Sequence, residues 1–162
     1  DSLKQALRDD RQVSVGLIDL DYFKKINDQY GHIEGDRVLK LVVKSILRVM
    51  RKSDEIARWG GDEFLLIMRN TTDEEGWEAA ERLREAVASE SDRIQGVTLS
   101  IGIVSQRADE SVESLLSRAD RVLYAAKAHG RNRVETRDHD DSSRDDESEL
   151  AESADNRSRS SP

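Results

Sequence analysis

The order of strands and helices in the sequence predicts an α+β domain with a βαββαβ core. One observation is a set of short apolar segments, such as residues 13–18, that are typical of buried strands. The other is a set of longer segments in which apolar residues recur at three- and four-residue spacing, as in helices. Together they give a ferredoxin-like split βαβ arrangement, with a central sheet that contains antiparallel strands and is flanked by helices.

The elements follow one another in this order. Residues 1–10 read as the end of a helix, because Leu3 and Leu7 lie one helical turn apart. Strands are expected at residues 13–18, 55–58, 63–68, 97–104 and 132–135, with a hairpin tip at 59–62. Helices are expected at residues 34–51, 73–89 and 111–128. The first two show the helical period at Val38, Leu41, Val42, Ser45, Ile46 and Val49, and at Ala79, Ala80, Leu83, Ala86 and Val87.

The composition changes beyond residue 134. Residues 135–162 contain ten Asp and Glu against four Arg and carry a net charge of −6, out of −8 for the whole chain. This segment is rich in serine and nearly lacks large apolar residues, so it cannot bury enough apolar surface to fold. We therefore expect one domain over residues 1–134 and an acidic, Ser-rich, disordered tail over residues 135–162.

Charge and composition exclude several classes of protein. Residues 1–134 carry a net charge of only −2, whereas nucleic-acid binding through bulk electrostatics requires a basic face. No apolar run approaches the roughly 20 residues that span a bilayer, and no secretory signal is visible. Cysteine is absent and the three histidines are dispersed, which disfavours zinc. We expect a cytoplasmic domain that binds no nucleic acid, and the full-length protein could carry a membrane anchor.

Carboxylates at two strand ends indicate chemistry on phosphate. Residues 59–64 read Trp-Gly-Gly-Asp-Glu-Phe, so that Asp62 and Glu63 follow two glycines, which permit positive φ and close approach of a ligand. Asp19 and Asp21 follow the first apolar strand, and ligands of open α/β sheets bind beyond strand ends. Magnesium prefers such oxygen ligands together with substrate phosphates. The alternatives are a solvated hairpin and, for Asp21, a cap of the strand end.

Four sequence blocks occur together in the order of one known family. They are residues 19–36 (DLDYFKKINDQYGHIEGD), 60–64 (GGDEF), 97–102 (VTLSIG) and 119–132 (ADRVLYAAKAHGRN). Together they resemble the GGDEF domain of diguanylate cyclases, over roughly residues 1–134. The resemblance implies a fold similar to the palm of nucleotide cyclases and polymerases. It also implies that two GTP molecules are converted into cyclic di-GMP and two pyrophosphates.

The resemblance implies metal-binding and catalytic roles for the carboxylates. Asp19 and the carbonyl of Leu20 would hold metal, with Asp62 as the shared ligand and Glu63 as a further one. Asp62 or Glu63 would also help to deprotonate the attacking 3′-hydroxyl. The implied cofactor is Mg²⁺ or Mn²⁺, since two cations about 3.5–4 Å apart can clamp the attacking and leaving oxygens.

The same resemblance implies how GTP is held. Asn27 and Asp36 match guanine-reading residues, and a carboxylate suits the N–H donors on the N1/N2 edge of guanine. Lys24, Lys127 and Arg131 match triphosphate contacts. Taken without the resemblance, Asn27 reads as a turn residue and Asp36 as a charge favourable to a helix start. Lys127 and Arg131 read as ordinary cations near the end of a helix that Gly130 terminates.

Further residues of these blocks have supporting roles in this interpretation. The backbone at residues 23–24, as a turn, would add N–H donors to the phosphates. His32 is interpreted as structural or as a neighbour of the binding residues. Phe23, Trp59 and Tyr124 are expected to pack rather than to stack on a base.

A second cluster matches the inhibitory site of the family, at which the product cyclic di-GMP binds. Arg51 and Asp54 form the Arg-x-x-Asp pattern five residues ahead of Gly60, and Arg82 matches a supporting arginine on the following helix. Arginine can fork to phosphate or to the Hoogsteen edge of guanine, while aspartate takes the Watson–Crick edge. The alternative is a surface ion pair that contributes little energy.

The front of the chain departs from the family. Its members usually begin with Asp-x-Leu-Thr-Gly-Leu-x-Asn-Arg, which nothing here matches, so we expect this fragment to bind GTP poorly. The chain starts without Met, so an excised domain with an upstream sensory domain is expected. Each domain supplies one GTP, which makes a homodimer necessary for catalysis. The alternative function is a non-catalytic receptor for GTP or cyclic di-GMP that regulates an attached module.

Overall fold

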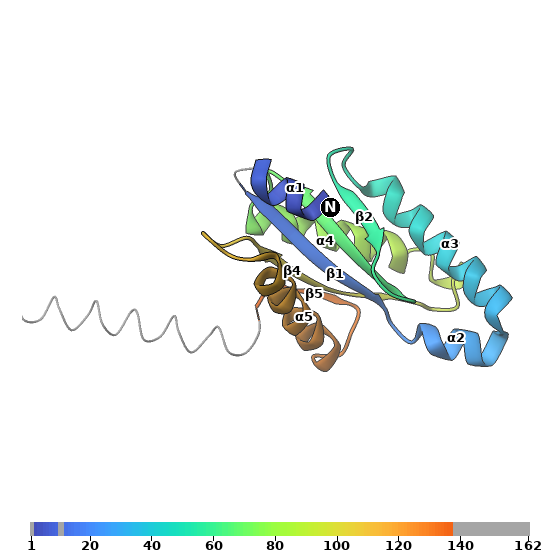
Figure 1. Cartoon of the computed structure of the whole chain (residues 1–162). Coiled ribbons are helices and arrows are strands. Elements are labelled where there is room, and N and C mark those ends of the chain that lie inside the picture. The colour runs from blue at the N-terminus through green and yellow to red at the C-terminus, as the bar shows by residue number, and fades with distance from the viewer. Residues whose placement is uncertain (1, 10–11, 138–162) are drawn as a thin grey trace, which may run out of the picture.

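A five-stranded mixed sheet forms the centre of the molecule (Figure 1). The computed structural model describes residues 2–9 and 12–137. The strands are β1 Val13–Leu20, β2 Glu55–Arg58, β3 Glu63–Arg69, β4 Leu99–Ser105 and β5 Arg133–Glu135. The helices are α1 Ser2–Asp9, α2 Phe23–Tyr30, α3 His32–Val49, α4 Asp73–Ala88 and α5 Val112–Ala128, with a 3₁₀ turn η1 at Ser91–Arg93.

The sheet has the predicted topology. Its strand order is β2-β3-β1-β4-β5, and β1 is antiparallel to both of its neighbours. β2 pairs antiparallel with β3, and β5 adds a parallel edge strand beside β4. The first four strands with α3 and α4 reproduce the ferredoxin-like βαββαβ order, which confirms the predicted fold.

The sheet is covered on both faces (Figure 1). Ile18 and Leu20 of β1 belong to one buried cluster, which α3 and α4 complete. Val15 and Leu17 point to the other face and pack in a second cluster with α1 and α5. Because side chains of a strand alternate between two covered faces, every residue of β1 is buried. This explains why β1 reads as a nearly continuous apolar run.

Three differences from the predicted elements lie next to one another in the chain. Helix α2 was not predicted, because only Phe23 and Ile26 are buried among its eight, mostly polar, residues. Gly31, at φ 84°, separates it from α3, which begins at His32 rather than at residue 34. β1 also extends two residues beyond the predicted end, so Asp19 lies within the strand instead of after it. Its backbone is fixed there by pairing with β3 and β4.

The boundaries of the other helices and strands agree with the predicted boundaries within two residues. β5 reaches Glu135, one residue past the predicted end of the domain. The predicted tail lies, beyond residue 137, outside the described residues. In the part of the chain that the structure describes, no helix is both long and apolar enough to cross a membrane.

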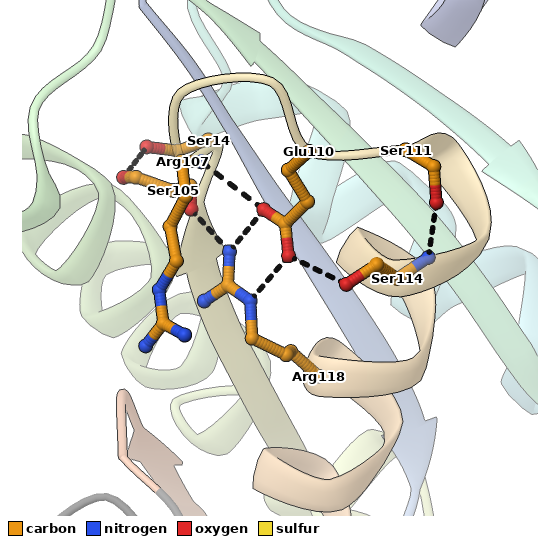
Figure 2. Close-up of polar contacts among 7 residues, drawn as sticks. All are labelled: Ser14, Ser105, Arg107, Glu110, Ser111, Ser114 and Arg118. Atoms are coloured by element: carbon orange, nitrogen blue, oxygen red, sulfur yellow. Dashed lines mark hydrogen bonds and ion pairs between the residues drawn. The ribbon is translucent and has the colours of Figure 1, made fainter. Parts of the chain in front are cut away.

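An ion pair fixes the N-terminal end of α5 (Figure 2). Arg118 of α5 contacts the Glu110 carboxylate at 2.6 Å and donates a hydrogen bond to the carbonyl of Ser105 at the end of β4. Glu110 also accepts from the main-chain N–H of Arg107 and from the Ser114 hydroxyl. Burial raises the pKa of Glu110, but these hydrogen bonds, above all that of Arg118, lower it to about 2.

Replacing Glu110 with alanine is expected to lower the free energy of unfolding at pH 7 by on the order of 2 kcal/mol, because the Arg118 guanidinium loses a charged partner. The ordinary pKa of this carboxyl is 4.5, so its contribution is complete above that pH and is lost as pH falls towards about 2. Urea unfolding between pH 7 and pH 2 measures both effects. The exposed Glu78→Ala is the control. A parent-like slope with pH in the Glu110 variant would contradict this assignment.

Candidate functional site

The end of the sheet opposite Glu110 brings together the predicted metal ligands. Asp19 of β1 is the register partner of Glu63 of β3. The main-chain N–H of Leu20 donates to the carbonyl of Asp62 at 3.1 Å. The ends of two neighbouring strands therefore hold all four predicted positions together, and Asp19 is only 8% exposed.

Three carboxylates at this end of the sheet, those of Asp19, Asp62 and Glu63, face one nearby cation, Lys127. Burial raises the pKa of Asp19; the nearby carboxylates of Asp62 and Glu63 raise it further, and Lys127, which donates a hydrogen bond to Asp19, opposes them. Asp19 therefore remains less acidic than an ordinary aspartate. A cation at this position would relieve the repulsion between the carboxylates.

The donor set fits a hard cation that also binds substrate. Within residues 2–9 and 12–137, no group of three or more Asp, Glu, His or Cys side chains is arranged to hold a metal ion. Magnesium seldom uses such a cage, because it usually takes one or two carboxylates together with phosphate oxygens and water. Asp19, Asp62 and the Leu20 carbonyl are oxygen donors of this kind.

The hairpin tip that carries Asp62 is fixed by its own backbone. The N–H groups of Trp59 and Gly60 donate to the Glu63 carbonyl at 2.8 and 3.2 Å. The Arg58 guanidinium donates to the carbonyls of Gly60 and Gly61. Neither glycine uses the positive φ angles that glycine permits. A Cβ at Gly61 would meet nothing within 4 Å, so the space next to Gly61 at the hairpin tip is open.

Asp21 has a structural role. Its buried carboxylate accepts hydrogen bonds from the hydroxyls of Thr98 and Ser100 at 2.7 and 2.6 Å. It also accepts from the main-chain N–H of Asn132 at 3.0 Å. Asp21 thus joins the end of β1 to β4 and to the loop after α5, which supports the strand-end alternative.

The two predicted guanine readers come from adjacent helices. Asn27 lies within α2 rather than in a turn, and Gly35 of α3 makes room for it, since a Cβ there would lie 1.8 Å from the Asn27 Oδ1. Asp36 lies beyond the first turn of α3, which argues against the helix-start alternative. It lines a groove of about 440 Å³ with Arg58 and Phe64.

The predicted triphosphate cations surround the carboxylate end of the sheet. Lys127 of α5 contacts Asp19, and the Arg131 guanidinium lies over the ring of Tyr22. Lys24 is exposed in the first turn of α2, whose N-terminus has no side-chain cap. Residues 23 and 24 are the central residues of a turn in which the Lys25 N–H donates to the Tyr22 carbonyl at 3.0 Å, and this turn begins helix α2. The first N–H groups of a helix remain available to an anion.

Comparison with known proteins identifies the family. The family model described as "Diguanylate cyclase, GGDEF domain" matches residues 1–133. The chain belongs to the GGDEF domain family.

Relatives and solved structures agree with this assignment. Diguanylate cyclase A of Treponema denticola is 45% identical over 127 residues, which are 75% of this chain and 34% of the relative. Diguanylate cyclase DgcP of Pseudomonas aeruginosa is 39% identical over 132 residues, which are 79% of this chain and 20% of the relative. The GGDEF domain of DgcB from Caulobacter crescentus, solved in complex with c-di-GMP, is 31% identical with a TM-score of 0.77. The match covers 84% of this chain and 86% of the Caulobacter chain. This chain thus spans about a third or less of the length of these two curated relatives.

The second cluster of this GGDEF domain is only partly assembled. Arg51 and Asp54 form a tight turn, in which the Asp54 N–H donates to the Arg51 carbonyl at 3.1 Å. Hydrogen bonds from Thr72 lower the pKa of Glu75 at the start of α4, and the Arg51 charge lowers it further, so Arg51 lies near α4. Arg82 is exposed on α4, and among the described residues no hydrogen bond or ion pair joins it to Arg51 or Asp54.

The expectation for the aromatic residues of the domain holds only for Phe23, which is buried. Trp59 is 54% exposed because it lies on the hairpin tip, and Tyr124 is 74% exposed because it faces outward from α5. His32 begins α3 and is exposed. Sequence reasoning gave no role to Tyr22, although its position directly after the carboxylates of Asp19 and Asp21 could have drawn attention to it.

Proposed function

We propose that this GGDEF domain is a diguanylate cyclase that converts two GTP into cyclic di-GMP and two pyrophosphates. The observation that carries the proposal is the buried Asp19 beside Asp62 and Glu63, with Lys127 at the same end of the sheet. Such a site can bind a cation and a polyphosphate together. The names of the relatives, and the c-di-GMP complex of the Caulobacter domain, support the same function.

The residues of the site divide the work of phosphoryl transfer. Asp19, the Leu20 carbonyl, Asp62 and Glu63 would hold Mg²⁺ or Mn²⁺, which would polarise the α-phosphate and favour an ionised 3′-hydroxyl. Asp62 or Glu63 accepts the proton of that hydroxyl.

The cations act on the other side of the reacting phosphate. Lys24, Lys127 and Arg131, with the N-terminus of α2, hold the triphosphate and stabilise the charge that develops on the leaving pyrophosphate. Asn27 and Asp36 select guanine by accepting and donating hydrogen bonds at its edge.

The reaction requires two domains. Each GGDEF domain holds one GTP, and each 3′-hydroxyl attacks the α-phosphate of the GTP on the facing domain. A homodimer is therefore the catalytic unit, and its formation is the natural point of control. We assign this control to an upstream sensory domain and place the reaction in the cytoplasm, with GTP as substrate.

The function is tested by incubating the chain with GTP and magnesium, with and without a fused dimerising segment. We expect cyclic di-GMP and pyrophosphate to form, at a higher rate for the dimeric fusion. Chromatography and mass spectrometry identify the products. Binding of GTP without any product from the dimeric fusion would favour a non-catalytic receptor and overturn the proposal.

Product inhibition is proposed to act through Arg51 and Asp54, with support from Arg82. Arg51→Ala is expected to weaken cyclic di-GMP binding at this site at least about tenfold, because a forked, charged hydrogen bond to the ligand is lost. The initial velocity should stay unchanged, since the Arg51–Asp54 turn lies outside the carboxylate cluster. Arg82→Ala should give a weaker version of the same effect.

Calorimetry with cyclic di-GMP and initial rates at several product concentrations measure both quantities for the Arg51 variant. Lys52→Ala, which removes an exposed neighbouring charge, is the matched control. Undiminished product binding to the Arg51 variant would assign Arg51 and Asp54 to an ordinary surface turn.

A further inference from the structure

We propose that Tyr22 is a positioning residue that holds the Arg131 side chain ready to contact the triphosphate of GTP. This inference rests on the proposed function, in which Arg131 is one of the cations that bind the substrate. A long arginine side chain on a loop must be held in place to act as a fork, and Tyr22 provides the contact that does so.

The contact is a cation–π interaction. The guanidinium carbon of Arg131 lies 4.8 Å from the centroid of the Tyr22 ring, and the ammonium nitrogen of Lys25 lies 5.0 Å from it. Both distances are inside the about 6 Å over which a ring attracts a cation. Tyr22 is 57% exposed, Lys25 is exposed and Arg131 is half-buried, so the ring is open to solvent and to a ligand.

The contact with the ring leaves the donors of Arg131 available. A cation–π contact uses no hydrogen-bond acceptor, so the N–H groups of the guanidinium can still fork to phosphate. A carboxylate partner would occupy those N–H groups and would compete with the substrate. Within residues 2–9 and 12–137 no carboxylate forms an ion pair with Arg131. The ring therefore orients this cation without consuming its hydrogen-bonding capacity.

The backbone fixes the positions of Tyr22 and Arg131. Tyr22 and Arg131 have φ angles of 59° and 63°, in the left-handed region that few bulky residues adopt. Their neighbours are joined directly, because the Asn132 N–H donates to the Asp21 carboxylate. Tyr22 also precedes the first turn of α2. The ring thus lies where the loop after β1 meets the loop after α5, which carries Arg131, and directly before helix α2, which carries Lys24.

The proposal is tested with Tyr22→Leu and Tyr22→Phe in the 162-residue chain. Leucine and phenylalanine meet the same left-handed backbone, but only phenylalanine keeps a ring. Calorimetry with α,β-methylene GTP, which cannot release pyrophosphate, should show affinity reduced about two- to fivefold for Tyr22→Leu and parent-like for Tyr22→Phe. Affinity for GMP, which lacks the β- and γ-phosphates, should be unchanged in both. Equal losses for GMP, or an equal loss in Tyr22→Phe, would overturn the proposal.

A double-mutant cycle identifies the partner of the ring. If Tyr22 acts through Arg131, then Tyr22→Leu should have no further effect on α,β-methylene GTP affinity in an Arg131→Ala background. The same loss in that background would overturn the proposal. Parent-like binding of the analogue by Arg131→Ala would overturn it too. Cyclic di-GMP production by the parent chain would then show separately whether the proposed function stands.

Discussion

Replacing Asp62 with alanine is expected to abolish cyclic di-GMP synthesis and to leave the fold intact. Asp62 would hold the metal that stabilises charge on the reacting phosphate, so its loss would remove several kcal/mol of transition-state stabilisation. A loss of about 4 kcal/mol corresponds to about a thousandfold in rate. The fold should persist, because the hydrogen bonds of the hairpin tip come from the backbone and from Arg58 rather than from the Asp62 side chain.

Product formation by the dimeric fusion and thermal unfolding measure the two parts of this result for Asp62. The control is Glu113→Ala, which removes an exposed carboxylate in the first turn of α5, at the far end of the sheet. It should turn over GTP like the parent. Parent-like turnover in the Asp62 variant would eliminate the carboxylate cluster as the catalytic site.

Replacing Asp36 with alanine is expected to weaken GTP binding about ten- to hundredfold and to narrow the preference for GTP over ATP. Without this carboxylate the N–H donors of guanine lose a charged acceptor, and a hydrogen bond to a charged group contributes roughly 1.5–3 kcal/mol. Adenine presents an acceptor at N1, so ATP gains nothing from Asp36 and loses nothing when it is removed. The selectivity therefore falls because GTP binding weakens.

Competition binding with GTP and ATP tests the role of Asp36. Asp28→Ala makes the same change of charge on the exposed surface of α2 and should leave the selectivity unchanged. If the Asp36 variant lost stability but kept its GTP affinity and selectivity, Asp36 would belong to the fold of α3 and not to the nucleotide site.

The sequence was enough to predict contacts between residues close in the chain and contacts that follow from strand pairing. The sequence predicted the hairpin that carries Asp62 and Glu63, and the apolar strand that delivers Asp19 beside it. It did not predict α2, because two buried side chains among eight residues give too weak a period. Propensity cannot detect a short helix that is stabilised mainly by packing.

The roles that depend on distant partners could not be predicted. Asp21 binds Thr98, Ser100 and Asn132, which are 77, 79 and 111 residues away in the chain. Gly35 serves Asn27, and the Arg131 guanidinium meets Tyr22 across more than half of the chain. Such pairings exist only once the sheet has formed, so no local pattern reports them.

The hydrogen bonds of Asp21 determine at which step, folding or nucleotide binding, the loops of the site lose conformational entropy. Because this carboxylate ties the loop after β1 to the loop after α5, both loops become ordered as the domain folds and not when nucleotide arrives. In the proposed dimer, each subunit would then present a preorganised half of the reaction centre. A regulatory signal would not need to reshape that half, and would act instead on the separation and mutual orientation of two rigid halves.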